Sequence, residues 1–198
     1  MYSKNALVVP RFLDGERVLR SMFDHVKVIG SRTIYSKHDR VVVEDTLEFA
    51  DGSRTEWVYF KTGSAVAVFP LTEDNRVILT KQYRHPMRKI IVDLPAGGIL
   101  SGEKPEQVAL RELEEETGFT AEKREWLGRF SWAPSNMEGC VEIFLAKDLR
   151  PIRDSSHEEI AGLEMMGFND LLDKVLKGEF VDSALVIATL LISSKKLL

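Results

Sequence analysis

The chain contains a single cysteine, Cys140, among its 198 residues. One cysteine excludes a disulfide within the chain and is typical of proteins that work in a reducing compartment. Residues 1–7 lack the apolar segment of a secretory signal peptide, and the apolar run at 184–192 is too short to span a bilayer. We therefore expect a cytoplasmic protein that does not act in a membrane.

Basic residues are not in excess either. The chain has 27 Lys and Arg residues against 31 Asp and Glu residues, and its formal net charge is -4. A chain without a broad basic surface does not attract polyanions, so nucleic acid is not an expected partner. The hydrophobic content of 44% and the charged content of 29% are those of an ordinary globular protein with a sizeable core.

Three glutamates gather on one predicted helix, which extends over residues 105–117. Glu112, Glu115 and Glu116 lie at positions i, i+3 and i+4, which share one helix face that we expect to be exposed. Like charges at this spacing repel, and a divalent cation such as Mg²⁺, which prefers carboxylate oxygens, would offset the repulsion. The simpler alternative is a solvated acidic helix surface, because most charge runs are of that kind.

The spacing of the surrounding residues favours the metal site. The chain matches the pattern G-x5-E-x7-R-E-U-x-E-E-x-G-U, where U is a bulky apolar residue; its members are Gly97, Glu103, Arg111, Glu112, Leu113, Glu115, Glu116, Gly118 and Phe119. Seven fixed identities coincide by chance on the order of once in 10⁹ starting positions. The pattern resembles the Nudix box at every defining position. The chain is thus similar to the Nudix hydrolases, which use Mg²⁺ or Mn²⁺ to hydrolyse a nucleoside diphosphate linked to a further group.

This resemblance assigns roles to the residues of the box. It implies that Glu112, Glu115 and Glu116 are metal ligands and that Arg111 orients a carboxylate. By the same analogy, Ala96 gives its backbone carbonyl to one ion. The adjacent glycine turn, Gly97 and Gly98, is a candidate substrate-binding segment.

Segments outside the box resemble the ADP-ribose pyrophosphatase branch of this superfamily. They are Gln-Tyr-Arg at 82–84, Asp-Leu-Pro-Ala-Gly at 93–97, Pro134, and Gly-Glu-Phe-Val-Asp at 178–182. The branch implies hydrolysis of the pyrophosphate bond of ADP-ribose or a related nucleoside diphosphate sugar to a nucleoside monophosphate and a sugar phosphate. GDP-mannose or another nucleotide sugar remains an alternative substrate. A sensor that binds ADP-ribose without hydrolysing it remains an alternative function.

Three further roles follow from the same branch. In this branch a glutamate from a loop after the box acts as the general base. Two segments of this chain offer such a glutamate, 134–138 and 155–159. Glu158 or Glu159 in the second segment is favoured over Glu138 in the first. Arg84 would bind a phosphate, although an arginine at a strand end is as often a surface charge. Trp57 would stack on the base, although aromatic residues in strands more often pack in a core.

The predicted architecture has two parts. Residues 1–62 form a strand-rich region, with strands expected at 26–29, 32–35, 41–49 and 55–60, and the last two form a hairpin. Residues 63–198 form the Nudix hydrolase domain, an α/β/α sandwich with a mixed sheet, which is also the fold implied by the resemblance. We expect its strands at 65–71, 76–83, 89–94, 126–132, 141–146 and 163–168, and its helices at 105–117, 169–177 and 182–195. The branch implies a homodimer in which the N-terminal strands contribute to dimerisation and to the substrate site.

Overall fold

The computed structural model describes residues 25–38, 40–152 and 160–198. The chain divides into two compact units, Met1–Lys61 and Thr62–Leu198. In the described ranges, no helix combines the length and the apolar character needed to cross a membrane.

The first unit contains an antiparallel sheet of three strands in the order β1-β2-β3. Its strands are β1 (Lys27–Lys37), β2 (Arg40–Glu48) and β3 (Arg54–Lys61). The two short strands expected at 26–29 and 32–35 are one strand, because the pairing with β2 continues through two register shifts at 28/30 and 33/35. The predicted hairpin is confirmed, and Asp51 stabilises its turn by accepting hydrogen bonds from the backbone and the hydroxyl of Ser53.

The second unit contains two sheets. One has the order β7-β4-β9-β8 and the other the order β10-β5-β6. The pair β4 and β9 is parallel and the other pairs are antiparallel, so the first sheet is mixed. The strands are β4 (Ala65–Pro70), β5 (Arg76–Arg84), β6 (Lys89–Asp93), β7 (Ala96–Gly98), β8 (Phe119–Ser131), β9 (Cys140–Pro151) and β10 (Ile160–Gly167).

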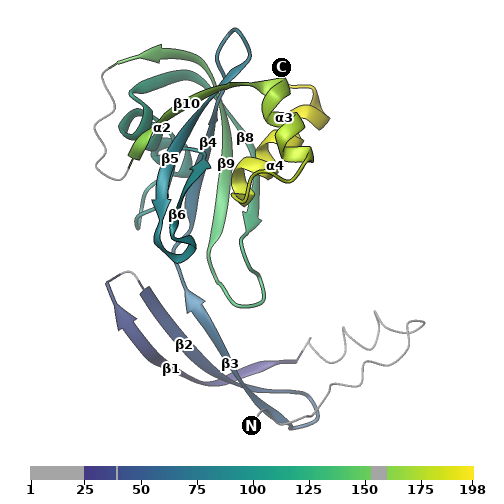
Figure 1. Cartoon of the computed structure of the whole chain (residues 1–198). Helices are drawn as coiled ribbons and strands as arrows, with labels where there is room; N and C mark the ends of the chain where they lie inside the picture. The colour runs from purple at the N-terminus through teal and green to yellow at the C-terminus, as the bar shows by residue number, and fades with distance from the viewer. Residues whose placement is uncertain (1–24, 39, 153–159) are drawn as a thin grey trace, which may run out of the picture. The chain divides into compact units, whose positions relative to one another are not determined.

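Helices cover this unit from two sides, and a short 3-10 helix, η1 (His85–Met87), follows β5. Helix α2 (Pro105–Thr117) lies on one side of the strands, and α3 (Phe168–Leu176) and α4 (Ser183–Lys195) lie on the other (Figure 1).

The alternation of side chains along β4 explains these layers. Val66 and Val68 point to one face and pack in a cluster with Leu113 of α2. Ala67 and Phe69 point to the other face and pack in a larger cluster that includes residues of α3 and α4. The predicted α/β/α sandwich with a mixed sheet is therefore confirmed.

The ends of α2 follow from two residues. Pro105 occupies the start of the helix, where a missing N–H removes no helical hydrogen bond. Gly118 ends the helix in the left-handed region with φ 74°, and its N–H donates to the carbonyl of Glu114. The three glutamates of the box are therefore carried by a helix with well-defined ends.

Candidate active site

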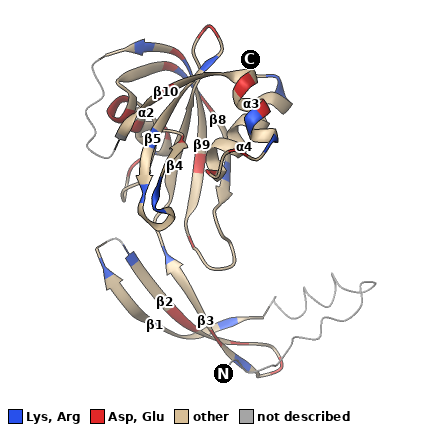
Figure 2. Ribbon diagram, viewed as in Figure 1, with Lys and Arg blue, Asp and Glu red and all other residues tan. Residues whose placement is uncertain are grey.

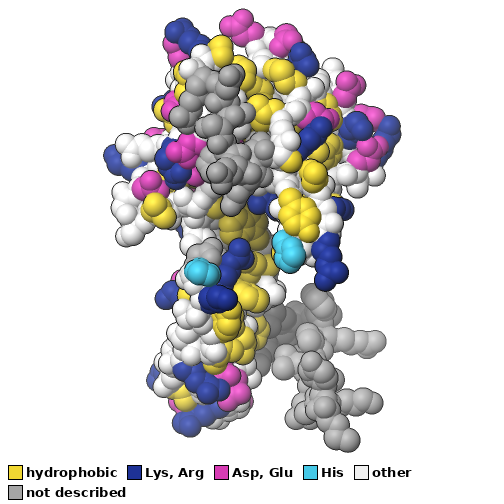
Figure 3. All heavy atoms as spheres, turned by 60° about the vertical axis from the view of Figure 1, so that its left-hand side comes forward, with side chains coloured by type: hydrophobic (Ala, Val, Ile, Leu, Met, Phe, Trp, Pro, Cys, Tyr) yellow, Lys and Arg dark blue, Asp and Glu magenta, His cyan; other side chains and the backbone are white. Residues whose placement is uncertain are grey.

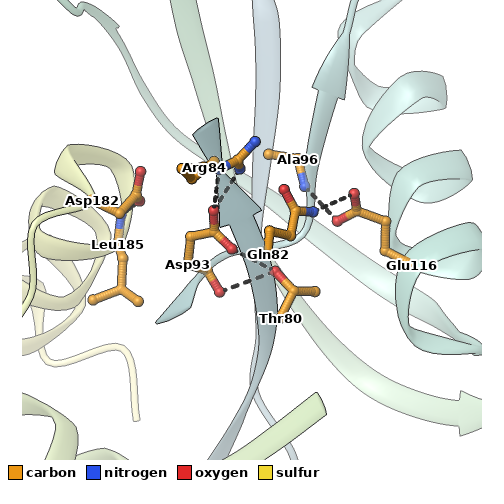
Figure 4. Close-up of polar contacts among 8 residues, drawn as sticks. All are labelled: Thr80, Gln82, Arg84, Asp93, Ala96, Glu116, Asp182 and Leu185. Atoms are coloured by element: carbon orange, nitrogen blue, oxygen red, sulfur yellow. Dashed lines mark hydrogen bonds and ion pairs between the residues drawn. The ribbon is translucent and has the colours of Figure 1, made fainter. Parts of the chain in front are cut away.

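Three polar side chains lie on one face of β5. Thr80, Gln82 and Arg84 alternate along the strand, and side chains two residues apart in a strand point to the same side. The Thr80 hydroxyl donates to Asp93 Oδ1 at 2.8 Å, and Gln82 Nε2 donates to Glu116 Oε1 at 2.9 Å (Figure 4). One strand therefore contacts the end of β6 and also the acidic helix α2.

Glu116 is on α2, and its side chain is buried against Ala96 of β7. Its Oε2 accepts a hydrogen bond from the backbone N–H of Ala96 at 3.0 Å, and its side chain faces Gln82 (Figure 4). The pKa of Glu116 is raised to about 7, chiefly by burial; the charges of Glu112 and Asp93 contribute to the rise, and the hydrogen bonds from Ala96 and Gln82 oppose it. The carboxylate of Glu116 is thus held in a setting that disfavours its negative charge.

Acidic residues lie along α2, drawn in red in Figure 2, but the face that they form is not exposed as we expected. Glu112 and Glu116 are only 6% and 5% exposed, whereas the Glu115 side chain is 35% exposed. The expectation is wrong for two of the three glutamates because β7 packs on this part of α2, with Gly97 directly against Glu112. Burial strengthens the repulsion between these charges, since water screens them less.

Arg111 contacts three carboxylates. Its NH1 lies 2.7 Å from Glu112 Oε1 and 3.2 Å from Glu115 Oε2, and its NH2 lies 3.7 Å from Glu103 Oε2. The loop carboxylate of Glu103 also accepts a hydrogen bond from the N–H of Leu100. A guanidinium in this position can orient the carboxylates of the box. The role of Arg111 in the reaction stays a prediction.

The glycine turn must approach α2 closely. A Cβ on Gly97 would overlap the carboxylate of Glu112, whereas a Cβ on Gly98 would meet no atom within 4 Å. The two glycines therefore differ in their surroundings: the space at Gly97 accommodates the Glu112 carboxylate, and the space at Gly98 is open. Their role in substrate binding stays a prediction.

The carboxylates of the box fit a divalent cation by their chemistry. Among the residues that the structure describes, no group of three His, Cys, Asp or Glu side chains is arranged to hold a metal ion. Arg111, Gln82 and the N–H of Ala96 occupy positions around these oxygens instead. Yet a rigid helix presents hard oxygen donors whose charges repel each other in a partly buried setting, and a dication would offset that repulsion.

A cavity of about 260 Å³ adjoins this cluster at Ala96. Arg84, Asp93, Trp132 and Asp182 line it together with small apolar residues of β4. Asp182 caps α4 by accepting a hydrogen bond from the N–H of Leu185 at 2.8 Å. Burial raises the pKa of Asp182; that hydrogen bond and the charge of Arg84 oppose the rise, and the charge of Asp93 adds to it.

Several predicted site residues lie elsewhere or outside the described ranges. Glu158 and Glu159 fall in residues 153–159, which are outside them. Glu138 is exposed in the loop between β8 and β9. Trp57 is 49% exposed on β3 of the first unit. The roles proposed for these four residues stay predictions.

The sequence interpretation assigned no individual role to four residues that line this region: Thr80, Gln82, Asp93 and Asp182. A signal for two of them was available. Polar residues at every second position of a strand that otherwise contains buried apolar residues indicate a polar face turned toward a site.

Comparison with known proteins identifies the family. A model of the NUDIX domain matches residues 61–186, which is more than half of the chain, and the chain therefore belongs to the Nudix family. The family membership predicted from the box is confirmed.

Similar proteins cover most of the chain. It is 35% identical over 161 residues to the ADP-ribose pyrophosphatase of Bacillus subtilis (strain 168), with 79% of this chain and 86% of that protein covered. It is 36% identical over 150 residues to the methanol dehydrogenase activator of Bacillus methanolicus, with 76% and 78% covered. A crystal structure of an ADP compounds hydrolase matches with a TM-score of 0.76 and 26% identity, and the match covers 85% of this chain and 92% of that chain.

The first prediction concerns the glycine turn. In Gly97→Ala the added methyl group displaces the Glu112 carboxylate. The variant should therefore lower the apparent affinity for Mg²⁺ and the hydrolysis rate at least tenfold, which is about the effect of disturbing a residue that supports a metal ligand. Gly98→Ala is the matched control for the steric effect, since its Cβ meets no atom, and it should leave the apparent affinity for Mg²⁺ unchanged. Equal losses in the two variants would contradict the steric explanation.

The second prediction concerns the charge of Asp182. Because its pKa is raised in the folded chain, the folded state holds the proton more tightly than the unfolded state, and its contribution to stability falls as pH rises from about 4. Asp182→Asn keeps a good helix cap and removes the buried charge, so its free energy of unfolding should exceed the wild-type value at about pH 7, and by less at about pH 4.

Urea unfolding at both pH values measures this difference. Asp182→Ala loses the cap as well and should be less stable than Asp182→Asn by about 1 kcal/mol at either pH. A difference between Asp182→Asn and wild type that does not change with pH would refute the assignment.

Proposed function

We propose that this Nudix hydrolase cleaves the pyrophosphate bond of ADP-ribose, or of a closely related nucleoside diphosphate sugar, to a nucleoside monophosphate and a sugar phosphate. The observation that carries the proposal is the complete box on α2, where Arg111 contacts Glu112 and Glu115, and Gln82 contacts Glu116. The substrate is supported by the similarity to an ADP-ribose pyrophosphatase over 86% of that protein.

The ligands of the metal ion follow from the same arrangement. Glu112, Glu115, Glu116 and the backbone carbonyl of Ala96 would hold Mg²⁺ or Mn²⁺. Bound there, the cation would neutralise charge on the diphosphate and lower the pKa of the attacking water. Members of this family are generally dependent on divalent metals, and the preference for Mg²⁺ is part of our proposal.

The chain's own residues supply binding and orientation. The guanidinium of Arg84 lies at the cavity next to Ala96, where it can donate hydrogen bonds to a phosphate oxygen. Arg111 keeps the carboxylates of Glu112 and Glu115 in place. Glu158 or Glu159 would take the proton from the attacking water. The cytoplasmic location of the protein remains a prediction.

A panel of substrates tests the proposal. With Mg²⁺, wild type should convert ADP-ribose to AMP and ribose 5-phosphate, identified by chromatography, and a chelator should abolish the reaction. Glu116→Gln should lower kcat by orders of magnitude, since it removes a charged ligand. Glu106→Gln, an exposed glutamate in the first turn of the same helix, is the control and should be unchanged.

Other outcomes of this panel have defined meanings. Faster hydrolysis of GDP-mannose or ADP-glucose would keep the enzyme class and replace the substrate. Tight binding of ADP-ribose without turnover in Mg²⁺ would replace the hydrolase with a sensor.

We further propose that the chain forms a homodimer through its first unit. Every residue of β1 is exposed, and β3 is exposed except at one position, so the sheet has little core of its own. Its exposed large hydrophobic residues are Val28, Ile29, Ile34, Tyr35, Trp57, Val58 and Phe60. Figure 3 shows yellow hydrophobic side chains gathered along this unit. A three-stranded sheet whose described residues expose such surfaces is expected to need a partner, and a second copy supplies one in the branch that the sequence resembles.

Light scattering after gel filtration tests the dimer. Wild type should elute with twice the mass of one chain, and Phe60→Asp should shift it toward the monomer because it places a charge in the buried interface. Leu176→Asp is a control on α3, where the side chain is 70% exposed in the second unit. A monomeric wild type would refute the proposal.

A further inference from the structure

Arg84 is held along one edge of its guanidinium. Its Nε lies 3.1 Å and its NH2 lies 2.5 Å from the same oxygen, Asp93 Oδ2 (Figure 4). A guanidinium has five N–H donors in a rigid plane, and Asp93 engages two of them. The Arg84 side chain is 44% exposed, so the remaining part of this plane is accessible at the cavity.

Asp93 is itself fixed on its other side. Its Oδ1 accepts the hydrogen bond from the Thr80 hydroxyl, and its side chain is only 3% exposed. Thr80 is fully buried, and it lies on β5 four residues before Arg84, on the same strand face. The carboxylate of Asp93 is therefore clamped between two side chains of one strand and has little freedom to rotate.

Such a buried carboxylate is not explained by the stability of the fold. Removing an ionised group from water is unfavourable, and an ion pair recovers the loss only in part. A well-packed apolar pair would serve the fold equally well, so the use of this pair lies in the orientation that it imposes on the guanidinium.

We propose that Asp93, fixed by Thr80, is the positioning residue that directs Arg84 to a phosphate oxygen of the bound diphosphate. This inference rests on the function proposed above. The cavity explains why direction matters: it is also lined by Asp182, the N-cap residue of α4, whose carboxylate can attract the guanidinium as well. Without Asp93, the Arg84 side chain is no longer held at the Ala96 side of the cavity.

A double-mutant cycle on the full-length chain tests the proposal. Asp93→Asn should lower kcat/KM about tenfold, the usual effect of losing a group that supports a site residue, through KM more than through kcat. Arg84→Ala should lower kcat/KM further. In the Arg84→Ala background, Asp93→Asn should cause no additional loss, because the residue on which Asp93 acts is already absent.

Two isosteric variants extend the cycle in case Asp93→Asn does not fold. Thr80→Val removes the hydroxyl that holds Asp93 and should raise KM in the same direction but less. Thr189→Val is the matched control, since Thr189 is also fully buried and its hydroxyl donates to the carbonyl of Leu185 on α4. It should change the unfolding midpoint without changing KM.

The outcomes separate this inference from the proposed function. Additive losses in the cycle, or a Thr80→Val variant that behaves like Thr189→Val, would overturn the positioning role. If wild type hydrolyses no compound of the panel, the proposed function fails, and the same cycle is then measured as binding of ADP by calorimetry. Coupling between Asp93 and Arg84 in that binding would still support the inference, and its absence would overturn it.

Discussion

The burial of two glutamates between α2 and the β7 turn is the constraint around which the site is built. Glu112 and Glu116 are carboxyl groups in a setting with little water, and the charge of Glu112 disfavours ionisation of Glu116. Neighbouring donors reduce this repulsion: Arg111 pairs with Glu112, and Gln82 and the N–H of Ala96 bond to Glu116. A cation bound among these oxygens, as we propose, would offset the remaining repulsion. The close approach of Glu112 restricts residue 97 to glycine.

Strand β5 links this cluster to the rest of the site. On its polar face, Gln82 bonds to Glu116 of α2. Thr80 and Arg84 on the same face bond to Asp93 at the end of β6. A single strand thereby sets the distance between the acidic cluster and the guanidinium of Arg84. That distance matters for a diphosphate, because its two phosphoryl groups must be neutralised together.

The sequence predicted those features that have local signals. Pro105 and Gly118 define α2 at the residues expected. Strand β7 was not predicted because its three residues show no side-chain pattern. The first half of β8 was not predicted because residues 122–125 are charged and exposed on an edge strand. In the site, the box residues were recognised from spacing. The burial of Glu116 and its bond to Gln82, 34 residues away, depend on long-range packing that no local pattern encodes.

Diffraction from crystals soaked in Mn²⁺ with a non-hydrolysable analogue of ADP-ribose tests the account most directly. The anomalous signal should lie about 2.2 Å from oxygens of Glu112 and Glu116, within the range for hard cations, with the guanidinium of Arg84 on a phosphate oxygen. An anomalous peak away from α2, or an analogue bound with these glutamates still paired only to Arg111 and Gln82, would contradict it.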